Sequence, residues 1–484
     1  MKPLAKRLGL ALDLGVVLCL ATATALAKPE LSGEQIYSQL CADCHGDKGQ
    51  GVADEHDEPL VGDWSIEKLA SNISKTMPED EEELCTGEEA KRVARYVFDS
   101  FYSTAAQARN HPARIKLARL TERQYLHSIA DLFSNFTNQA SFGQPDGLKG
   151  TYHNSRNLRR NDKSFERTDA TVDFQFGTGT PAQDRQGFKS EEFSANWTGS
   201  VLAEESGDYE FFITTENGAN LWVNGMNRKL IDAWVSNGKL REAKGTVRLI
   251  GGRAYPLKLE FFKFKETSAS IRLEWKPPHG ARRIIPKRCL SPRVTERTVV
   301  VQQPFPPDDS SIGYERGSAV SKKWDEATTF ASIEVANLVA DQLDALAGAT
   351  PDDKQREAKV RAFCNRFVEL AFRRPLTPEQ QQLFIDSRFA PGKSDTDSVK
   401  EVILLALKSP RFLYPDLGQA DDHAVAARLA LGLWDSLPDA ELLRAANADR
   451  LGSPEQARQQ ALRMLRDPRS RAKLRSALHH WIGI

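Results

Sequence analysis

The chain has 484 residues, the length of about three domains of ordinary size. Its 66 basic and 66 acidic residues balance, which argues against nucleic acid as the main partner. Beyond the amino terminus, no apolar run approaches the roughly 20 residues that a membrane-spanning helix needs. We therefore expect no membrane span once that terminus is processed.

The first 27 residues have the pattern of a secretory signal peptide. Basic residues precede an apolar run over 8–20, and Ala25-Leu26-Ala27 has the small residues of a cleavage site. We therefore expect residues 1–27 to be removed on export. The mature protein would then be periplasmic or extracellular.

The functional interpretation depends on the sequence Cys41-Ala42-Asp43-Cys44-His45. Two thiols at i and i+3 lie on one helical turn, where each can form a thioether to a haem vinyl group. The imidazole of His45 can then bind the iron. Zinc or a redox dithiol is the alternative for a Cys pair, but no second pair follows to complete a zinc site. The pattern predicts one covalently attached haem c, held by Cys41, Cys44 and His45.

The residues that follow this motif predict the rest of a haem pocket. The glycine-rich segment 46–51 lets the backbone lie against a flat macrocycle. Met77 is the predicted second axial ligand of the haem iron, with ordinary core packing as its alternative role. His56, in an acidic loop, is the competing ligand.

Apolar residues at helical spacing precede the Cys pair and recur over 88–101. The order of helix, C-x-x-C-H, glycine loop, Met-Pro and closing helix resembles a class I cytochrome c across residues 30–104. The resemblance implies a small all-α haem domain, which we place at 28–104. A haem with both His and Met bound has no open site, so its natural role is electron transfer.

Three further cysteines, Cys85, Cys289 and Cys364, remain after signal removal and haem attachment. They allow at most one disulfide and one free thiol. The sequence does not choose among the pairings.

Apolar residues alternate with polar ones in the middle of the chain, which predicts short β-strands. The alternating runs are 172–176, 193–197, 209–213, 257–261 and 271–275. Asn224-Gly225 and Gly251-Gly252 are the expected hairpin turns. The pattern predicts an antiparallel β-sandwich over 141–292.

Several landmarks of this region resemble the protective-antigen-type domain of toxins, glycosidases and adhesins. They are Gly147 to Tyr152, Phe193 to Gly199, Ser206 to Phe211, Asn217 to Gly225 and Ile271 to Pro278. The resemblance implies sugar binding, often with calcium held by two adjacent Asp. Glu216 and Asn217 stand at those positions, so one carboxylate is lost and the other is longer. Glu216, Asn217 and Trp234 are the candidate carbohydrate contacts.

The remaining sequence is mainly helical. Residues 105–140 predict a linker and a short helix that begins with a capping box at Thr121 and Gln124. The proline-rich segment 293–330 predicts an extended linker. Apolar residues at helical spacing, with capping boxes at Thr377 and Ser453, predict two all-α domains, 331–416 and 417–484.

Short motifs in these helical parts resemble a planctomycete-type family of large exported cytochromes with helical domains of unknown function. The motifs are Arg119 to Tyr125 with Asp131-Leu132, Ala371 to Thr377, Ser409 to Tyr414 and Leu433 to Asp439. Together with the other two regions, this resemblance implies a multidomain α plus β protein.

A metal cluster of His479 and His480 with Asp421, Asp422 and His423 is one catalytic candidate. Adjacent His residues on a helix point about 100° apart and do not chelate together. The sequence also has no phosphate-binding glycine loop, nucleophile elbow or zinc-protease helix. We therefore name no catalytic residue.

The sequence as a whole predicts an exported monohaem c-type cytochrome that carries single electrons between periplasmic redox partner proteins. The sandwich would bind glycan or another protein. Two alternatives stay open: a haem-dependent oxidoreductase that acts on carbohydrate, and a surface adhesion or scaffold protein in which haem is accessory. We expect an electron carrier rather than a catalyst with its own substrate.

Overall fold

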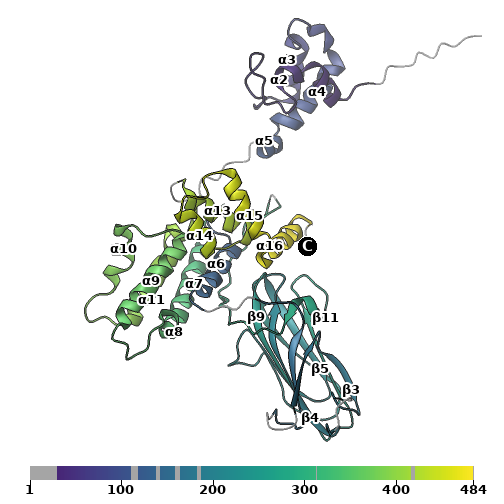
Figure 1. The fold of residues 1–484 in the computed structure, drawn as a ribbon. Coiled ribbons are helices and arrows are strands. Elements are labelled where there is room, and N and C mark those ends of the chain that lie inside the picture. The colour runs from purple at the N-terminus through teal and green to yellow at the C-terminus, as the bar shows by residue number, and fades with distance from the viewer. Residues whose placement is uncertain are drawn as a thin grey trace, which may run out of the picture. The chain divides into compact units, whose positions relative to one another are not determined.

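The computed structural model describes residues 30–110, 118–137, 142–158, 164–182, 187–311, 313–415 and 420–482. The predicted signal peptide at 1–27 lies outside these residues. The chain divides into two compact units, residues 1–114 and 115–484. The first unit is helical, and the second contains two antiparallel sheets and a helical region, so the predicted mixed fold class is confirmed (Figure 1).

Short helices make up the first unit. They are α1 (Gly33–Leu40), α2 (Ala42–His45), α3 (Ile66–Thr76), the 3-10 turn η1 (Glu82–Leu84), α4 (Gly87–Val97), the π-turn η2 (Phe98–Tyr102) and α5 (Thr104–Asn110). Ser32 and Gln35 form a capping box at the start of α1. Helix α4 packs against both α1 and α3 and buries Val93 and Val97 in the common core.

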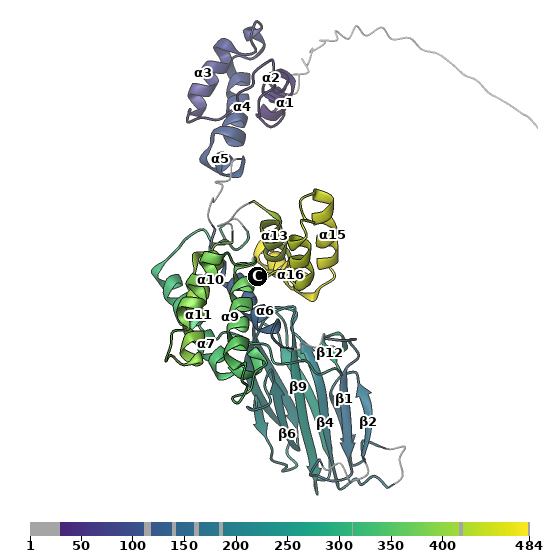
Figure 2. The same cartoon turned by 60° about the vertical axis from the view of Figure 1, so that its left-hand side comes forward.

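The second unit begins with α6 (Glu122–Ser134) and then forms the β-sandwich. Its first sheet has the order β2-β1-β4-β9-β6-β7, with β12 paired to β4, and the second has the order β11-β10-β5-β8, with β3 paired to β10 (Figure 2). The strands are β1 (Leu148–His153), β2 (Ser164–Asp169), β3 (Asp173–Gly177), β4 (Glu192–Leu202), β5 (Gly207–Thr215), β6 (Gly218–Val223), β7 (Ile231–Ala233), β8 (Arg241–Leu249), β9 (Ala254–Phe264), β10 (Ala269–Lys276), β11 (Arg283–Ile284) and β12 (Leu290–Ser291).

The inner faces of the two sheets explain the alternation of the sequence. Trp197 of β4 lies opposite Leu259 of β9, and Phe211 of β5 lies opposite Trp275 of β10. These four side chains are almost completely buried. Alternate residues of each strand thus form the core between the sheets.

Of the two predicted hairpin turns, Asn224-Gly225 does begin the connection of an antiparallel pair, β6 and β7, whereas the prediction at Gly251-Gly252 was wrong. Asn224 has a positive φ of 59°, but β6 and β7 are joined by a longer loop in which Leu230 N–H donates to the carbonyl of Leu221 at 2.7 Å. Gly251-Gly252 joins β8 to β9, which lie in different sheets. It links the two layers because β8 pairs with β5, whereas β9 pairs with β4 and β6.

The helical region contains ten further α-helices among its described residues. They are α7 (Lys322–Asp341), α8 (Leu343–Ala347), α9 (Arg356–Phe372), α10 (Pro378–Phe384), α11 (Asp395–Lys408), α12 (Pro410–Leu413), α13 (Asp422–Trp434), α14 (Ala440–Asn447), α15 (Pro454–Met464) and α16 (Pro468–Ile482). The predicted capping boxes at Thr121, Thr377 and Ser453 all form. Tyr125 of α6 is buried in the same core as Trp324 of α7, so α6 is part of this region's core.

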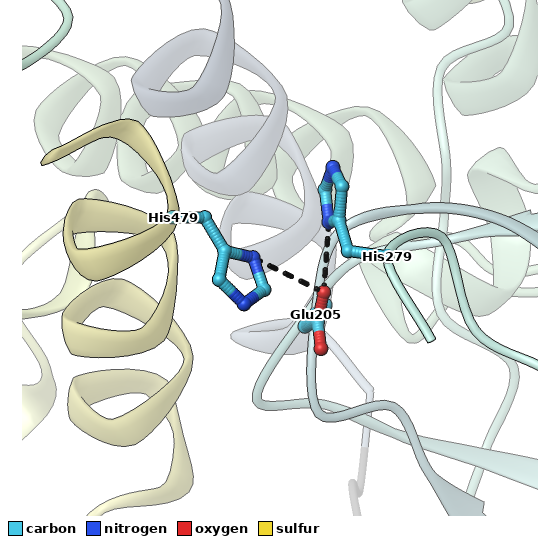
Figure 3. Close-up of side chains that lie close together, drawn as sticks. All are labelled: Glu205, His279 and His479. Carbon is cyan, nitrogen blue, oxygen red and sulfur yellow. Dashed lines mark hydrogen bonds and ion pairs between the residues drawn. The ribbon is translucent and has the colours of Figure 1, made fainter. Parts of the chain in front are cut away.

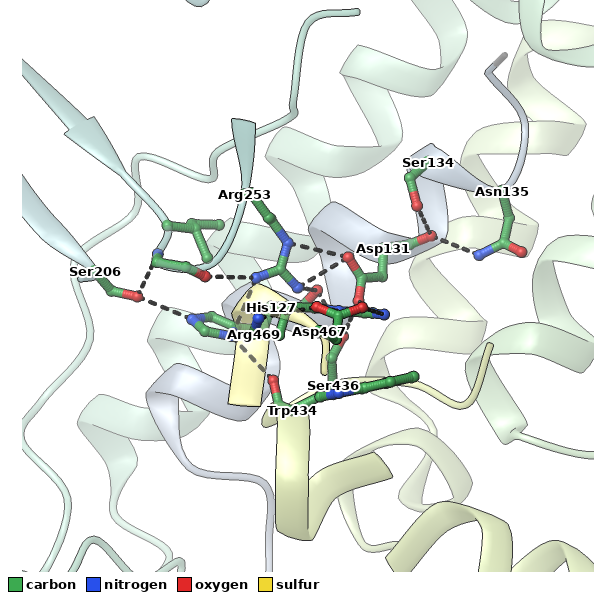
Figure 4. A network of polar contacts seen from close by, with 12 residues as sticks. His127, Asp131, Ser134, Asn135, Ser206, Arg253, Trp434, Ser436, Asp467 and Arg469 are labelled. Carbon is green, nitrogen blue, oxygen red and sulfur yellow. Dashed lines mark hydrogen bonds and ion pairs between the residues drawn. The ribbon is translucent and has the colours of Figure 1, made fainter. Parts of the chain in front are cut away.

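A buried polar network around α6 holds the sandwich against the helical region (Figure 4). The Oδ1 of Asp131 accepts hydrogen bonds from Arg253 Nε at 3.0 Å and Nη2 at 2.9 Å. Its Oδ2 accepts from Ser436 Oγ at 2.6 Å and Arg469 Nη1 at 2.8 Å. Since Arg253 belongs to the β8–β9 connection, one carboxylate joins α6, the sandwich and the carboxyl-terminal helices.

The three remaining cysteines lie in three separate cores. Cys85 is buried in the first unit, Cys289 in the sandwich and Cys364 in the helical region. All three are free thiols. In the described part of the chain, none of the helices has both the length and the apolar character needed to cross a bilayer.

Candidate haem site

The two thiols and the imidazole of the predicted attachment site lie on one short helical turn. Helix α1 ends at Leu40 and α2 begins at Ala42. Cys41 lies between the two helices, with a non-helical φ of −126° and a ψ of −31°. The N–H of His45 donates to the carbonyl of Cys41 at 2.9 Å. Gly46, with a φ of 78°, ends the turn. Cys41 therefore caps this turn, and Cys44 and His45 are its last two residues.

The glycine-rich loop after α2 is tied back to the motif. Tyr37 donates from its hydroxyl to the buried carbonyl of Gly46 at 2.7 Å, and Gly51 N–H donates to the carbonyl of His45 at 2.9 Å. Gly51 has a φ of 82°, and a Cβ there would lie 2.6 Å from the carbonyl oxygen of Asp57. Only glycine fits this position without moving the loop.

Burial changes the proton affinity of both Cys41 and His45. Burial, with smaller contributions from Cys85 and Cys44, raises the pKa of the Cys41 thiol to about 12. Burial, and then the neighbouring His56, lowers the pKa of His45. The imidazole is therefore neutral at neutral pH, the form that binds a metal. Its Nδ1 is buried and has no hydrogen-bond partner among the described residues.

The structure places His56 closer to the motif than the sequence suggested. Val52 and His56 form an isolated β-bridge that closes the loop, and the ring centroids of His56 and His45 lie 4.5 Å apart. The acidic residues around His56 indicated a solvated loop, yet its side chain is only half-exposed. The glycines of segment 46–51, which turn this loop back, were the feature of the sequence that could have predicted that His56 lies near His45.

Met77 lies at the carboxyl end of α3. Its N–H donates to the carbonyl of Ile73 at 3.0 Å, and the residue is half-buried. Its role as the second axial ligand stays a prediction.

The candidate carbohydrate residues gather at one end of the sandwich. Glu216 and Asn217 connect β5 to β6 and are buried. The carboxylate of Glu216 accepts hydrogen bonds from Ser268 Oγ at 3.0 Å and from the Ser270 hydroxyl. Asn217 Nδ2 donates to the carbonyl of Ser268 at 3.3 Å. These two buried side chains therefore bond to groups inside the loop and do not form part of its surface.

The guanidinium of Arg241 bonds the backbone of this loop. Arg241 Nη2 donates to the carbonyls of Asn217 at 3.1 Å and Ala233 at 2.9 Å, and also to that of Val235. Three carbonyl oxygens that could bind a hard cation are thus satisfied by an arginine. The Glu216 carboxylate and these three carbonyls thus have protein partners, whereas Oδ1 of Asn217 is buried without a partner among the described residues.

Trp234 is the candidate that reaches the surface. It is half-buried, and its ring packs against Phe262 with centroids 4.5 Å apart. The sequence analysis missed two neighbours on the same loop, Val235 and Leu240, which are 59% and 69% exposed. Together with Trp234 they give this end of the sandwich an apolar surface.

A separate groove of about 780 Å³ lies on the side of the sandwich. The loop after β6 and the segment 294–302 form its walls, and Asn227, Arg228 and Lys229 provide polar and basic groups. No motif of the sequence pointed to this groove.

Three segments of the chain match known protein families. Residues 29–97 match the family described as cytochrome c oxidase, cbb3-type, subunit III. Residues 144–288 match the PA14 domain, and residues 420–484 match a family described as a protein of unknown function (DUF1592). The chain therefore carries a cytochrome c-type domain, which implies haem c, and a PA14 domain.

Individual proteins match smaller parts of the chain. The anti-sigma-I factor RsgI3 of Acetivibrio thermocellus is 33% identical over 150 residues, which cover 31% of this chain and 22% of that protein. An anti-sigma factor domain-containing protein of Clostridium clariflavum is 30% identical, with a TM-score of 0.27, over 33% of this chain and 51% of that chain. A PA14 sugar-binding domain from an RTX adhesin is 16% identical, with a TM-score of 0.24, over 30% of this chain and 98% of that chain. The chain thus spans about a fifth of the curated relative and about half of the Clostridium clariflavum protein.

Proposed function

We propose that this protein is an exported monohaem c-type cytochrome that passes single electrons between redox partner proteins. The observation that carries the proposal is the short helix α2, which contains Cys44 and His45 and is capped by Cys41, within a region that matches a cytochrome c family. When bound, haem supplies a one-electron iron couple. The two thiols would hold it covalently, and neutral His45 would bind the iron.

The second axial ligand decides between electron transfer and catalysis. If Met77 bound the iron together with His45, no position would be left for a substrate, and the thioether of Met77 would raise the reduction potential. Such a site would suit an electron carrier and not a haem-dependent oxidoreductase that acts on carbohydrate. It also makes Met77 the residue to test.

The test compares the haem-loaded protein with Met77→Ala. We expect the substitution to abolish the far-red charge-transfer band that a methionine sulfur gives on ferric iron, and to lower the reduction potential. Met226→Ala is the matched control, because Met226 is 45% exposed on the sandwich. An unchanged spectrum and potential in Met77→Ala would show that another group is the ligand. A change in His56→Ala alone would identify that group as His56.

The location of the protein is part of the same proposal. The predicted signal peptide, covalent haem and the resemblance to planctomycete-type exported cytochromes all suit a periplasmic or extracellular protein. Mass spectrometry of the secreted protein tests this directly. We expect an amino terminus at Lys28 and a mass increased by one haem. A chain that keeps residues 1–27 contradicts the proposal.

We further propose that the sandwich places the cytochrome on glycan or on another protein. Trp234, Val235 and Leu240 support this, because an exposed apolar loop at one end of a domain is typical of a binding surface. A glycan array with the full chain should show binding that Trp234→Ala removes and that added calcium does not change. If glycan binding survives this substitution, Trp234 is not the binding residue, and the groove beside Lys229 is the next candidate site.

A further inference from the structure

Two histidines and a glutamate from distant parts of the chain meet where the sandwich contacts the last helix (Figure 3). Glu205 lies in the turn between β4 and β5, His279 in the turn between β10 and β11, and His479 on α16. One potential ligand atom from each lies within 4.8 Å of the other two. The side chains of Glu205 and His479 are only 11% and 20% exposed.

Both imidazoles face the same carboxylate oxygen. His279 Nδ1 lies 2.9 Å from Glu205 Oε2, a normal hydrogen-bond distance. His479 Nδ1 lies 3.6 Å from that oxygen, which is too long for a hydrogen bond. This nitrogen is buried and without a hydrogen-bond partner in the described part of the chain. Hydrogen bonding alone therefore leaves a buried polar atom unsatisfied, which is costly.

A metal ion would satisfy all three groups. Tetrahedral zinc with bonds of about 2.0–2.1 Å to nitrogen and oxygen places its ligand atoms about 3.3–3.4 Å apart. The two distances to Glu205 Oε2, 2.9 and 3.6 Å, lie on either side of this value. The third separation, between the ligand nitrogens of the two histidines, lies within 4.8 Å, so the imidazoles would have to move closer together around the ion.

The surroundings hold Glu205 in place. Its second oxygen, Oε1, accepts from Arg475 Nη1 at 3.2 Å, which turns Oε2 toward the histidines. The hydroxyl of Tyr209 bonds both the N–H and the carbonyl of Glu205 at 3.1 Å. Such outer contacts orient a ligand before the metal binds.

The residue next to His479 takes no part in this cluster. His480 Nε2 pairs with Glu315 at 3.3 Å, and its Nδ1 lies 2.9 Å from the carbonyl of Ser476. The structure also separates the other members of the cluster considered from sequence. His423 bonds Asn447, and Asp421 pairs with Arg374.

A cavity of about 110 Å³ borders the cluster, lined by the three residues and by Arg123, Ser206, Ala472, Ser476 and His480. This volume exceeds the roughly 30 Å³ that one water molecule occupies in the liquid. A fourth ligand, such as water, therefore has room.

We propose that Glu205, His279 and His479 form a three-ligand site for a divalent transition-metal ion. Two imidazoles and one carboxylate without a thiolate suit zinc, and the fourth position faces the cavity. Because the ligands come from two sandwich turns and from α16, the ion ties the carboxyl-terminal helix to the sandwich.

The experiment uses the full, haem-loaded chain. After chelation of adventitious metal, we titrate zinc by calorimetry and count bound zinc by elemental analysis. We expect one zinc per chain, and X-ray absorption at the zinc edge should show two imidazole ligands. Zinc should also raise the thermal unfolding temperature, since it binds the folded form. Absence of stoichiometric zinc in the wild-type chain overturns the proposal.

Variants assign the ligands. His279→Ala should weaken zinc binding by about tenfold or more. Loss of an outer contact already weakens metal binding by about 10–100-fold, and loss of a ligand should cost at least the lower of these values. The side chain of His279 is 47% exposed in a turn, so its removal should leave the circular dichroism spectrum unchanged. His423→Ala is the control and should bind zinc as the wild type does, because His423 bonds Asn447 and does not line the cavity. Equal affinity in His279→Ala, or equal loss in His423→Ala, refutes the assignment.

Discussion

Removal of the Asp131 carboxylate should strongly destabilise the second unit. Its two oxygens accept four hydrogen bonds, three of them from Arg253 and Arg469. The side chains of these two arginines are only 8% and 16% exposed. In Asp131→Ala both guanidinium groups stay buried without this partner, although Arg469 keeps its pair with Asp467.

The expected loss follows from the general cost of leaving a buried charge unpaired. Breaking a buried ion pair by removing one partner costs about 3–5 kcal/mol. Burial by itself would raise the pKa of Asp131, but Arg253 and Arg469 outweigh it and hold this pKa below its usual range. The carboxylate is therefore charged at neutral pH, and the full pair is lost in the variant.

The assay is denaturant unfolding followed by tryptophan fluorescence. Trp434 is a suitable probe because the guanidinium of Arg469 lies 3.7 Å above its ring. Asp325→Ala is the matched control: Asp325 pairs with Lys408 at 2.7 Å, but its side chain is 65% exposed, so the loss should be about 1 kcal/mol or less. If Asp131→Ala costs no more than this control, the network does not hold the unit together.

Three other predictions concern single side chains. Burial, with Arg253 and Arg123, holds the pKa of His127 well below its usual value, so the unfolded chain takes up a proton first as pH falls below about 6.5. The free energy of unfolding should therefore drop by about 2 kcal/mol by pH 5. Denaturant midpoints at pH 7 and pH 5 measure this drop, which should be absent in His127→Gln. Arg241→Ala should lower the unfolding temperature of the sandwich, while calcium should leave the wild-type temperature unchanged in calorimetry. Gly51→Ala should destabilise the haem-loaded first unit by about 1–3 kcal/mol in denaturant, whereas Gly225→Ala, with open space around its Cβ, should have little effect.

The controls for these three predictions are built into the same measurements. A pH dependence that persists in His127→Gln would assign it to other groups. A rise in unfolding temperature with calcium would contradict the role given to Arg241. Equal stability of Gly51→Ala and Gly225→Ala would show that the loop after α2 can relax.

Features set by near neighbours in the chain were predicted well. The C-x-x-C-H spacing placed its three side chains on one turn, and the capping boxes at Thr121, Thr377 and Ser453 began helices as expected. Period-two alternation located the main strands of the sandwich. The capping boxes and the C-x-x-C-H turn depend on contacts within a few residues, and the alternation can be read along each strand even though the core that it faces is built from distant strands.

Features set by distant partners were not predicted. Gly251-Gly252 has a hairpin composition, yet it crosses between sheets because strand pairing is decided by the whole sandwich. The acidic group that faces His479 is Glu205, which lies more than 200 residues earlier in the chain and not next to it as His480 does. No local pattern distinguishes such residues from ordinary surface groups.

The position of α6 explains why the second unit is one compact body. Asp131 and His127 lie on the same helix, and His127 Nε2 lies 3.0 Å from Ser206 Oγ while Asp131 binds Arg253. Helix α6 thus bonds both to a sandwich turn and to the connection between the sheets. Its other face supplies Tyr125 to the helical core. The sandwich turn at Ser206, the connection at Arg253 and, through Arg469, helix α16 are therefore all joined to the helical core by one helix.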